Sequence, residues 1–247
     1  MGILGIDIGG SGIKGAVVDV ETGQLLTERV RLATPEGANP EEVAEVVRKV
    51  FQRMDYRGPI GCGFPAIVKN GIAQSAANVD LRWIDTNIND LLKNETGCQV
   101  FTVNDADAAG IAEMRFGAGK ELKKGVGLII TLGTGIGTAV FTDGVLLPNT
   151  EFGHIEIRGK DAEERTSDAA RQRKLLSWEQ YAKRLQEFLT CLEKLISPDL
   201  IIIGGGISKN SAQYFPYLQT RARLVPAEFL NQAGIVGAAL YASEQAK

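Results

Sequence analysis

The chain opens with Ile3-Leu-Gly-Ile-Asp-Ile-Gly-Gly-Ser-Gly-Ile-Lys-Gly-Ala-Val-Val-Asp-Val20, and this stretch sets the architecture. Residues 3–8 are typical of a buried strand, the glycines that follow of a tight turn, and residues 13–20 of a second strand. The pattern predicts an antiparallel hairpin with a short loop. A plain dinucleotide-binding unit begins strand–helix–strand, so this opening argues against one.

Strands and helices alternate through the rest of the first half. A third strand is expected over residues 25–32, and Pro40 is well placed to begin a helix because proline is tolerated in a first helical turn. Gly97 is a suitable helix stop. The other expected elements are strands at Ile60–Phe64 and Gln99–Val103 and helices at about residues 86–95 and 107–115.

The second half repeats a strand, a glycine turn and a returning strand, now at Val126–Thr131 and Thr138–Thr142. Ser177-Trp-Glu-Gln180 has the spacing of a capping box and opens a long helix that ends near Ile196. The remaining expectations are an apolar strand at Leu200–Ile203, a final helix at about 232–245, and a loop or loose helix over the polar residues 157–176.

The composition is that of an ordinary globular protein, since 44% of the 247 residues are hydrophobic and 23% are charged. No run is long and apolar enough to span a bilayer, and no secretory signal or N-terminal DNA-binding module is expected before the strand at Ile3. Cys62, Cys98 and Cys191 lie far apart without a CxxC pair, which favours a reducing compartment and disfavours structural zinc. We expect a cytoplasmic protein with no membrane or nucleic-acid partner.

The formal net charge is −3, so any anionic substrate must be held by a local patch or by backbone amides. A glycine turn after a strand offers such amides to phosphate oxygens, although a single turn is more often only structural. Three turns in one chain favour phosphate binding, and the P-loop pattern is absent. The turns are Asp7-Ile-Gly-Gly-Ser-Gly12, Leu132-Gly-Thr-Gly-Ile-Gly137 and Gly204-Gly-Gly-Ile-Ser208.

Two acidic residues of the first half are candidates for the chemistry. Asp7 lies on an otherwise apolar strand, where a carboxylate is costly unless it is paired or near a cation, so we expect it to orient Mg²⁺ through water. Lys14 either reaches a phosphate or faces outward from the second strand. Asp105 follows Asn104 at a strand-to-helix junction, where both residue types are favoured helix caps. A carboxylate there also suits a general base for phosphoryl transfer to a hydroxyl.

Glu151-Phe-Gly-His154 contains the only histidine of the chain. A lone histidine is more often structural than catalytic. Here the glutamate three residues earlier and the intervening glycine favour a polar pocket that binds several hydroxyls, as a sugar requires. A metal pair lacks further ligands.

These motifs, with Glu113, occur in the order seen in the ROK family of sugar kinases and repressors, and the resemblance spans nearly the whole chain. It implies two actin-like, ribonuclease H-like α/β lobes around a sugar cleft, each a mixed sheet flanked by helices, in a homodimer. The lobes would comprise residues 1–108 with the helix at 232–247, and residues 109–231.

The resemblance also implies roles for individual residues. Asp105 resembles the catalytic base, and Asn104, Glu151 and His154 resemble ligands of the sugar hydroxyls. The first two turns resemble the phosphate loops, and the third resembles a nucleotide-side loop. The implied phosphate-side residues are Asp7, Gly9, Gly10, Ser11, Gly12, Lys14, Gly133, Thr134, Gly135 and Gly137, and the implied nucleotide-side residues are Gly204, Gly205, Gly206 and Ser208.

One departure from the family pattern is clear. Most members carry a CxCGxxGC zinc motif after the Glu-x-Gly-His segment, and this chain has no cysteine between Cys98 and Cys191, so zinc is not expected. The missing motif obscures a further sugar-binding glutamate. Glu156, Glu163 and Glu164 are candidates, and we take Glu163 as the expected ligand.

The zinc-less form is similar to the polyphosphate glucokinase branch, whose members move the terminal phosphate of inorganic polyphosphate to the 6-hydroxyl of glucose. Some members also use ATP or accept mannose. The supporting segments include Ala76-Ala-Asn-Val-Asp-Leu-Arg-Trp83, whose Asn78 is a further expected sugar ligand. Lys120, Lys123 and Lys124 are candidates for holding polyphosphate near the second turn, although a lysine-rich turn is more often only solvated surface.

Three alternatives remain at this point. An ATP-dependent hexose kinase of the same family would carry the same motifs. A sugar-sensing regulator is disfavoured by the early first strand and by Asp105. An actin-like cytoskeletal protein would have no use for the Glu151–His154 pocket.

Overall fold

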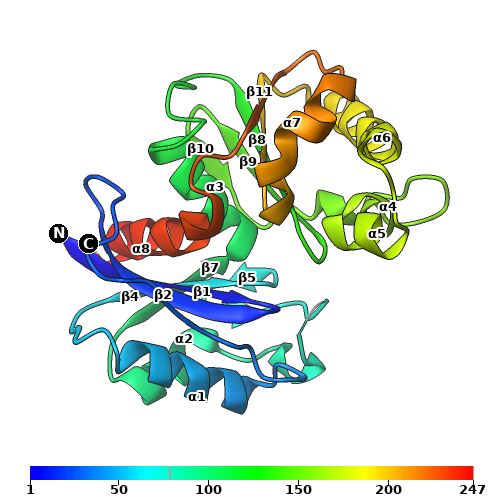
Figure 1. Cartoon of the computed structure of the whole chain (residues 1–247). Helices are drawn as coiled ribbons and strands as arrows, with labels where there is room; N and C mark the ends of the chain where they lie inside the picture. The colour runs from blue at the N-terminus through cyan, green and yellow to red at the C-terminus, as the bar shows by residue number, and fades with distance from the viewer. Residues whose placement is uncertain (78, 247) are drawn as a thin grey trace. The chain divides into compact units, whose positions relative to one another are not determined.

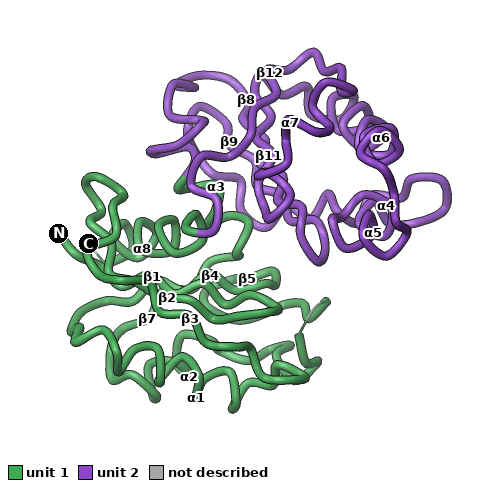
Figure 2. Tube along the Cα trace, in the orientation of Figure 1, with its two compact units in different colours: residues 1–112, 232–247 green, residues 113–231 purple. Residues whose placement is uncertain are grey.

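The computed structural model describes residues 1–77 and 79–246 (Figure 1). The chain divides into two compact units, which Figure 2 colours separately. Unit 1 comprises Met1–Ala112 and Gln232–Lys247, and unit 2 comprises Glu113–Asn231. Each unit is built around one five-stranded sheet.

The sheet of unit 1 has the strand order β3-β2-β1-β4-β7. Its strands are β1 (Gly2–Gly9), β2 (Gly12–Asp19), β3 (Val30–Leu32), β4 (Ile60–Phe64) and β7 (Val100–Asn104). β1 and β2 form the predicted antiparallel hairpin, with Asp7 directly opposite Lys14. β1, β4 and β7 are parallel to one another, so their carboxyl ends meet at one edge of the sheet.

The predicted third strand was too long. Ordered pairing with β2 is confined to Val30–Leu32, and only a single bridge joins Val18 to Leu25. The reason is that a side chain takes the place of a backbone acceptor between the strands. The Val17 backbone N–H donates to the Thr27 hydroxyl at 3.0 Å. Threonine side chains compete in this way with regular backbone pairing.

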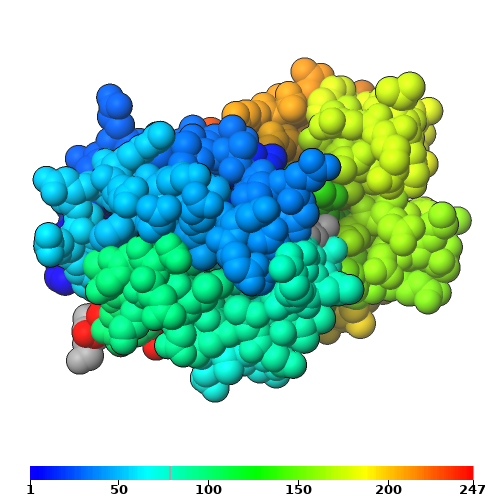
Figure 3. All heavy atoms as spheres, turned by 90° about the horizontal axis from the view of Figure 1, so that it is seen from below, coloured from blue at the N-terminus to red at the C-terminus, as the bar shows by residue number. Residues whose placement is uncertain are grey.

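Helices cover both faces of this sheet. α1 (Pro40–Phe51) and α2 (Ile88–Thr96) lie on one face, and Figure 3 shows the outer surface that they form when the molecule is seen from below. Pro40 begins α1 as predicted, and Gly97 ends α2 in the left-handed conformation. α8 (Ala233–Gln245) packs against β1, β4 and β7 on the other face, beside α3 (Asp105–Arg115).

α8 approaches its neighbours more closely than side chains would allow. A methyl group on Gly5 or Gly61 would overlap the backbone carbonyl oxygen of Ile235 or Ala238 in α8. Likewise, a methyl group on Gly237 would overlap the carbonyl oxygen of Ala108 in α3. Glycine at these contacts lets helix and sheet backbones touch, and it fixes where α3 begins relative to the sheet.

Unit 2 repeats the mixed arrangement with the order β10-β9-β8-β11-β12. Its strands are β8 (Val126–Leu132), β9 (Ile136–Thr142), β10 (Val145–Leu147), β11 (Leu200–Gly204) and β12 (Arg223–Pro226). β8 pairs antiparallel with β9 and parallel with β11. The apolar side of the long helix α6 (Trp178–Ile196) joins these strands in one buried core. The predicted capping box is confirmed, because Ser177 and Gln180 each bond the other's backbone N–H.

Residues 157–176 contain two short helices, α4 (Ala162–Thr166) and α5 (Asp168–Arg173), where a loop or a loose helix was expected. Ser167 separates them: its backbone is extended, and its hydroxyl accepts a hydrogen bond from the Ala170 N–H at 3.1 Å. A serine at this position ends one helix and caps the next.

Both units are mixed sheets flanked by helices, so the predicted α/β class with two such lobes is confirmed. Among the described residues, no helix is both long and apolar enough to cross a bilayer.

Candidate active site

The carboxyl ends of the parallel strands in unit 1 bring two acidic residues together. Gly63 of β4 lies in register with Asp7 of β1 on one side and with Val103 of β7 on the other. A methyl group on Gly63 would lie 3.8 Å from Asp7 Oδ1 and 3.7 Å from the Asp105 Cα. Those two atoms are therefore at most about 7.5 Å apart, the sum of the two distances. Asp7 and Asp105 thus share one edge of the sheet.

Asp7 is held as an ion pair at this edge. Its Oδ2 lies 3.0 Å from Lys14 Nζ, and the two side chains are only 15% and 21% exposed. The amino end of α8 is also close, because a methyl group on Gly234 would come within 2.7 Å of Asp7 Cγ. A lysine and a helix N-terminus both compensate a negative charge, which accounts for an acidic residue on an apolar strand. Lys14 is therefore tethered to Asp7.

Asn104 takes the capping role that the sequence offered for Asp105. Its Oδ1 accepts hydrogen bonds from the N–H groups of Ala106 at 2.9 Å and Asp107 at 3.0 Å, and its Nδ2 donates to the Ala66 carbonyl at 3.1 Å. The residue is 7% exposed, and at most one amide hydrogen remains for a ligand. As a sugar ligand Asn104 can therefore offer a single donor.

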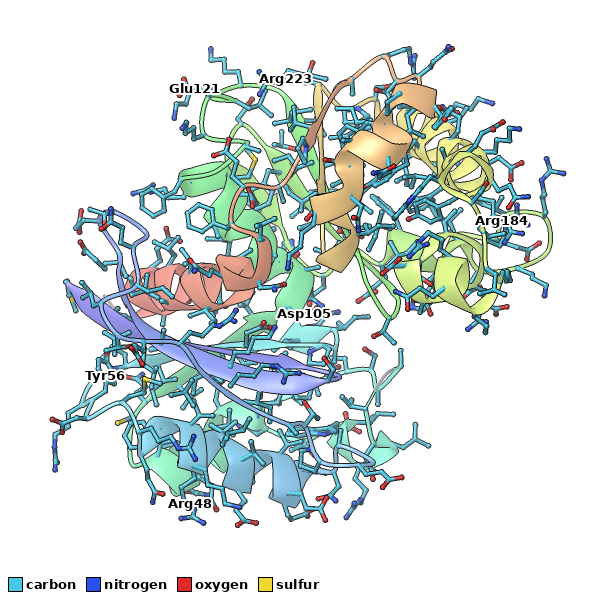
Figure 4. All side chains as sticks on the ribbon, viewed as in Figure 1. Arg48, Tyr56, Asp105, Glu121, Arg184 and Arg223 are labelled. Carbon is cyan, nitrogen blue, oxygen red and sulfur yellow. The ribbon has the colours of Figure 1, made fainter. Side chains whose placement is uncertain are left out.

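Asp105 begins α3 immediately after this cap and is labelled in Figure 4. Its Oδ1 accepts the Ala106 N–H at 2.8 Å, and the residue is only partly buried. The helix thus starts two residues earlier than predicted, with Asn104 as its cap. A negative charge in the first turn of a helix interacts favourably with the helix dipole. A carboxylate at this position suits the role of a general base.

The glycine turns differ in what the fold demands of them. At Gly10, Gly133 and Gly206 a methyl group would meet no atom of the described residues within 4 Å, and none has a left-handed φ. The fold therefore does not require glycine at these three positions. Gly205 is different, because its φ is 78° and a methyl group would overlap the backbone of Leu132. Open space above a glycine backbone suits the close approach of a phosphate.

The other turn residues have more local roles. Arg31 of β3 donates from Nη2 to the Ser11 carbonyl at 2.7 Å and leans over Gly12, which places a second cation at the first turn. No sequence motif marks Arg31 as a site residue. Ser208 is buried and donates its hydroxyl to the Gly205 carbonyl at 2.8 Å, so its side chain shapes the third loop.

In unit 2, Phe152–His154 form a one-turn 3₁₀ helix with Glu151 as its N-cap, and the side chains of Glu151 and His154 lie near two further carboxylates. His154 Nδ1 lies 2.9 Å from Asp161 Oδ2, and Nε2 lies 4.0 Å from Glu151 Oε2. Glu163 of α4 accepts the Ile136 N–H of the second glycine turn at 3.2 Å. Glu156 and Glu164 are exposed, so Glu163 is the candidate that the local geometry favours.

The charges in this cluster shift one another's titration. The pKa of Glu151 is raised, chiefly by burial and further by the charge of Glu163, while His154 opposes the shift. The pKa of His154 is also raised, first by its hydrogen bond to Asp161 and then by the carboxylates of Glu163 and Glu151. An imidazolium beside carboxylates offers both donors and acceptors to a polyhydroxyl ligand.

The lysine cluster does not lie where it was expected. Lys120, Lys123 and Lys124 precede Val126, the first residue of β8, whereas the second glycine turn follows Leu132 at the other end of that strand. A strand of this length separates them by about 20 Å. All three lysines are exposed. The expectation that they flank the second turn was wrong, because a strand carries the chain away from them.

Within unit 1 the structure thus groups Asp7, Lys14 and Asp105 with the first turn, and within unit 2 it groups Glu151, His154 and Glu163 with the second. Asn78 lies outside the described residues. No group of three histidine, cysteine or carboxylate side chains in the described part of the chain has the arrangement of a metal site. Mg²⁺ needs no such cage, because it keeps several waters and binds one or two carboxylates plus phosphate oxygens. Asp7 and Asp105 fit that requirement.

Mixed sheets with glycine turns at strand ends and carboxylates beside them are typical of phosphotransferases of the actin-like class. The sequence model of the ROK family matches residues 3–169. The chain belongs to the ROK family, as its motifs predicted.

Three relatives show the extent of the similarity. A polyphosphate glucokinase of Mycobacterium tuberculosis (strain CDC 1551 / Oshkosh) is 48% identical over 96% of this chain and 89% of its own length. The crystal structure of an inorganic polyphosphate/ATP-glucomannokinase from Arthrobacter sp. strain KM has a TM-score of 0.96 and 50% identity, and covers 99% of both chains. A ROK family glucokinase from Streptomyces griseus, in complex with glucose and AMPPNP, has a TM-score of 0.83 at 25% identity, covering 99% of this chain and all of its own.

Proposed function

We propose that this protein transfers the terminal phosphoryl group of inorganic polyphosphate to the 6-hydroxyl of glucose. The observation that carries the proposal is the 0.96 TM-score to a polyphosphate/ATP-glucomannokinase over 99% of both chains. The polyphosphate glucokinase at 48% identity agrees with it, and the activity predicted from the sequence is confirmed by these two relatives. The positions of the residues support the following steps.

Asp105 accepts the proton of the 6-hydroxyl as its oxygen attacks the terminal phosphorus, and the shortened polyphosphate leaves from the opposite side. Asp7, paired with Lys14 at 3.0 Å, is the carboxylate that would hold Mg²⁺ through water. When bound, Mg²⁺ offsets the negative charge of the phosphoryl group in transfer. Backbone N–H groups of the first two glycine turns bind phosphate oxygens, and Arg31 and Lys14 add positive charge at the first.

Within unit 2, Glu151, His154 and Glu163 bind sugar hydroxyls. Within unit 1, the donor left on Asn104 and the residue Asn78 are further candidate ligands of the sugar. Hydrogen bonds that orient a reacting hydroxyl supply much of the rate in phosphoryl transfer. We also propose that the protein acts as a homodimer in the cytoplasm, as the family resemblance implies. Its three free cysteines suit a reducing compartment.

ATP and mannose form the second candidate donor and acceptor, because the Arthrobacter protein is described by both. The decisive experiment is a sugar-6-phosphate assay with polyphosphate and ATP side by side, each with glucose and with mannose. With glucose as the acceptor, we expect a higher kcat/KM for polyphosphate than for ATP. Turnover with ATP alone would replace the proposal by an ATP-dependent hexose kinase. If neither donor supports turnover, the result would favour the sugar-sensing regulator instead.

The open glycines give a further test of the phosphate sites. Gly10→Ala and Gly133→Ala should each leave the melting temperature within about 2 °C of the parent, because the added methyl meets no described neighbour. Each should raise the KM for polyphosphate about tenfold or more, since hydrogen bonds to charged oxygens contribute about 1.5–3 kcal/mol. Initial rates at varied polyphosphate, with glucose saturating, measure the effect.

Gly205→Ala is the matched control. Its left-handed φ and the overlap with Leu132 should lower the melting temperature, in contrast to the two open positions. An unchanged KM for polyphosphate in both Gly10→Ala and Gly133→Ala would remove these turns from the donor site.

A further inference from the structure

Asp161 lies beside His154 and belongs to none of the motifs identified in the sequence. Its Oδ2 lies 2.9 Å from His154 Nδ1, and the two side chains are 45% and 43% exposed. The opposite ring nitrogen, Nε2, is the one that lies on the side of Glu151. Nδ1 of the imidazole is therefore occupied by Asp161. Nε2 is directed towards Glu151, the carboxylate that is expected to bind the sugar.

The loop between these residues is built to return Asp161 to His154. The backbones of Ile157 and Lys160 bond each other in both directions, at 2.8 and 3.3 Å, which closes a tight turn. A bridge pairs Glu156 with Asp161. Arg158 in this turn then bonds Glu187 of α6 at 2.7 Å. The position of Asp161 is thus set by backbone hydrogen bonds and an ion pair rather than by its contact with His154.

A carboxylate bonded to one nitrogen of an imidazole fixes both the ring orientation and the site of the proton. With Asp161 on Nδ1, that nitrogen carries a hydrogen in every protonation state. The state of Nε2 then decides what the ring offers to a ligand: a donor when the ring is charged, and an acceptor when it is neutral.

We propose that Asp161 is a positioning residue, which holds the Nδ1–H of His154 so that Nε2–H of the imidazolium donates to a sugar hydroxyl oxygen beside Glu151. The inference rests on the proposed function, since it takes His154 as a sugar ligand. Glu151 accepts a hydrogen bond from a sugar hydroxyl, and His154 donates one to a hydroxyl oxygen. The pair can therefore bind a sugar hydroxyl both as a donor and as an acceptor.

The electrostatics agree with this assignment. The charged groups that face His154 are Asp161, Glu163 and Glu151, and all three are carboxylates. They raise the pKa of His154, with the hydrogen bond to Asp161 as the first cause. The imidazolium therefore persists to higher pH than in an isolated histidine. Without the charge of Asp161, the pKa of His154 should fall and the proton should be lost at lower pH.

The test uses Asp161→Asn, with Asp161→Glu as the conservative variant and Glu156→Gln as a control that removes an exposed carboxylate from the same turn. Because His154 is the only histidine, the ¹⁵N and ¹H resonances of its ring are assigned without ambiguity. Their titration reports the pKa and the tautomer directly. We expect a lower pKa and loss of the Nδ1–H preference in Asp161→Asn, recovery in Asp161→Glu, and no change in Glu156→Gln.

Kinetics complete the test. In Asp161→Asn the KM for glucose should rise about tenfold at pH 8, and this rise should begin at a lower pH than in the parent. The kcat should change less than about twofold. This is the result expected when one charged hydrogen bond to the bound sugar is lost. Identical titration and tautomer in the parent and in Asp161→Asn would overturn the positioning role. If the NMR shifts occur but glucose does not perturb the His154 resonances and no sugar is phosphorylated, the proposed function fails instead.

Discussion

Asp105→Ala is expected to lower kcat about 10³-fold while glucose still binds. A positioned general base contributes about 10²- to 10⁴-fold to a rate. Asp105 can be replaced without removing the cap of α3, because Asn104 accepts the Ala106 and Asp107 N–H groups. The variant should therefore fold, with loss confined to the chemical step. Steady-state kinetics with polyphosphate, and glucose binding by calorimetry, measure the two parts separately.

Asp90→Asn serves as the matched control, since Asp90 is an exposed carboxylate in the first turn of α2, another helix of unit 1. It should retain the parental kcat. Asp105→Asn, which keeps the size and an acceptor for the Ala106 N–H, should be as inactive as Asp105→Ala. A near-normal kcat in both variants of Asp105 would exclude it as the base and would direct attention to Asp7, the other carboxylate at this sheet edge.

Gly237→Ala is expected to destabilise the protein by more than about 3 kcal/mol, at the upper end of what overpacking costs. The added methyl would overlap the Ala108 carbonyl oxygen, a backbone atom of α3 that no side-chain rotation can move away. Total stability is about 5–15 kcal/mol, so a large part of it would be lost. Urea unfolding followed by circular dichroism measures the change.

Gly10→Ala is the natural comparison, because its methyl meets no described atom and its unfolding midpoint should match that of the parent. If Gly237→Ala shows the parental midpoint as well, α8 does not hold α3 as closely as the backbone contacts indicate. If Gly237→Ala folds but has a lower kcat than the parent, the α8–α3 contact sets the position of Asp105.

Local patterns were enough to predict most elements. The hairpin of β1 and β2, the start of α1 at Pro40, the stop of α2 at Gly97 and the capping box at Ser177 all depend on neighbours within a few residues. The length of β3 could not be predicted in this way. It is cut short by the hydroxyl of Thr27, whose partner Val17 lies ten residues earlier.

The motifs were enough to propose candidate residues for the site, but not to predict which of Asn104 and Asp105 caps α3. Both Asn104 and Asp105 can cap a helix, and only the observed hydrogen bonds assign the cap to Asn104. The roles of Gly63 and Arg31 could not be predicted, because they depend on strand register. The register places Asp7 beside Gly63 and Lys14 opposite Arg31. The lysines before β8 were misplaced for the converse reason, since nearness in sequence is not nearness in space when a strand intervenes.

α8 has a consequence for how the polypeptide acquires its structure during synthesis. Unit 2 is one continuous segment, whereas unit 1 is completed only by a helix that the ribosome makes after all of unit 2. Unit 2 therefore has every residue of its core available first, and domains generally fold as units when their residues have emerged. Until then the glycine-lined surface of β1 and β4 has no partner. The amino-terminal half of the nascent chain must wait for its last helix, so chaperone protection during that interval would favour correct folding.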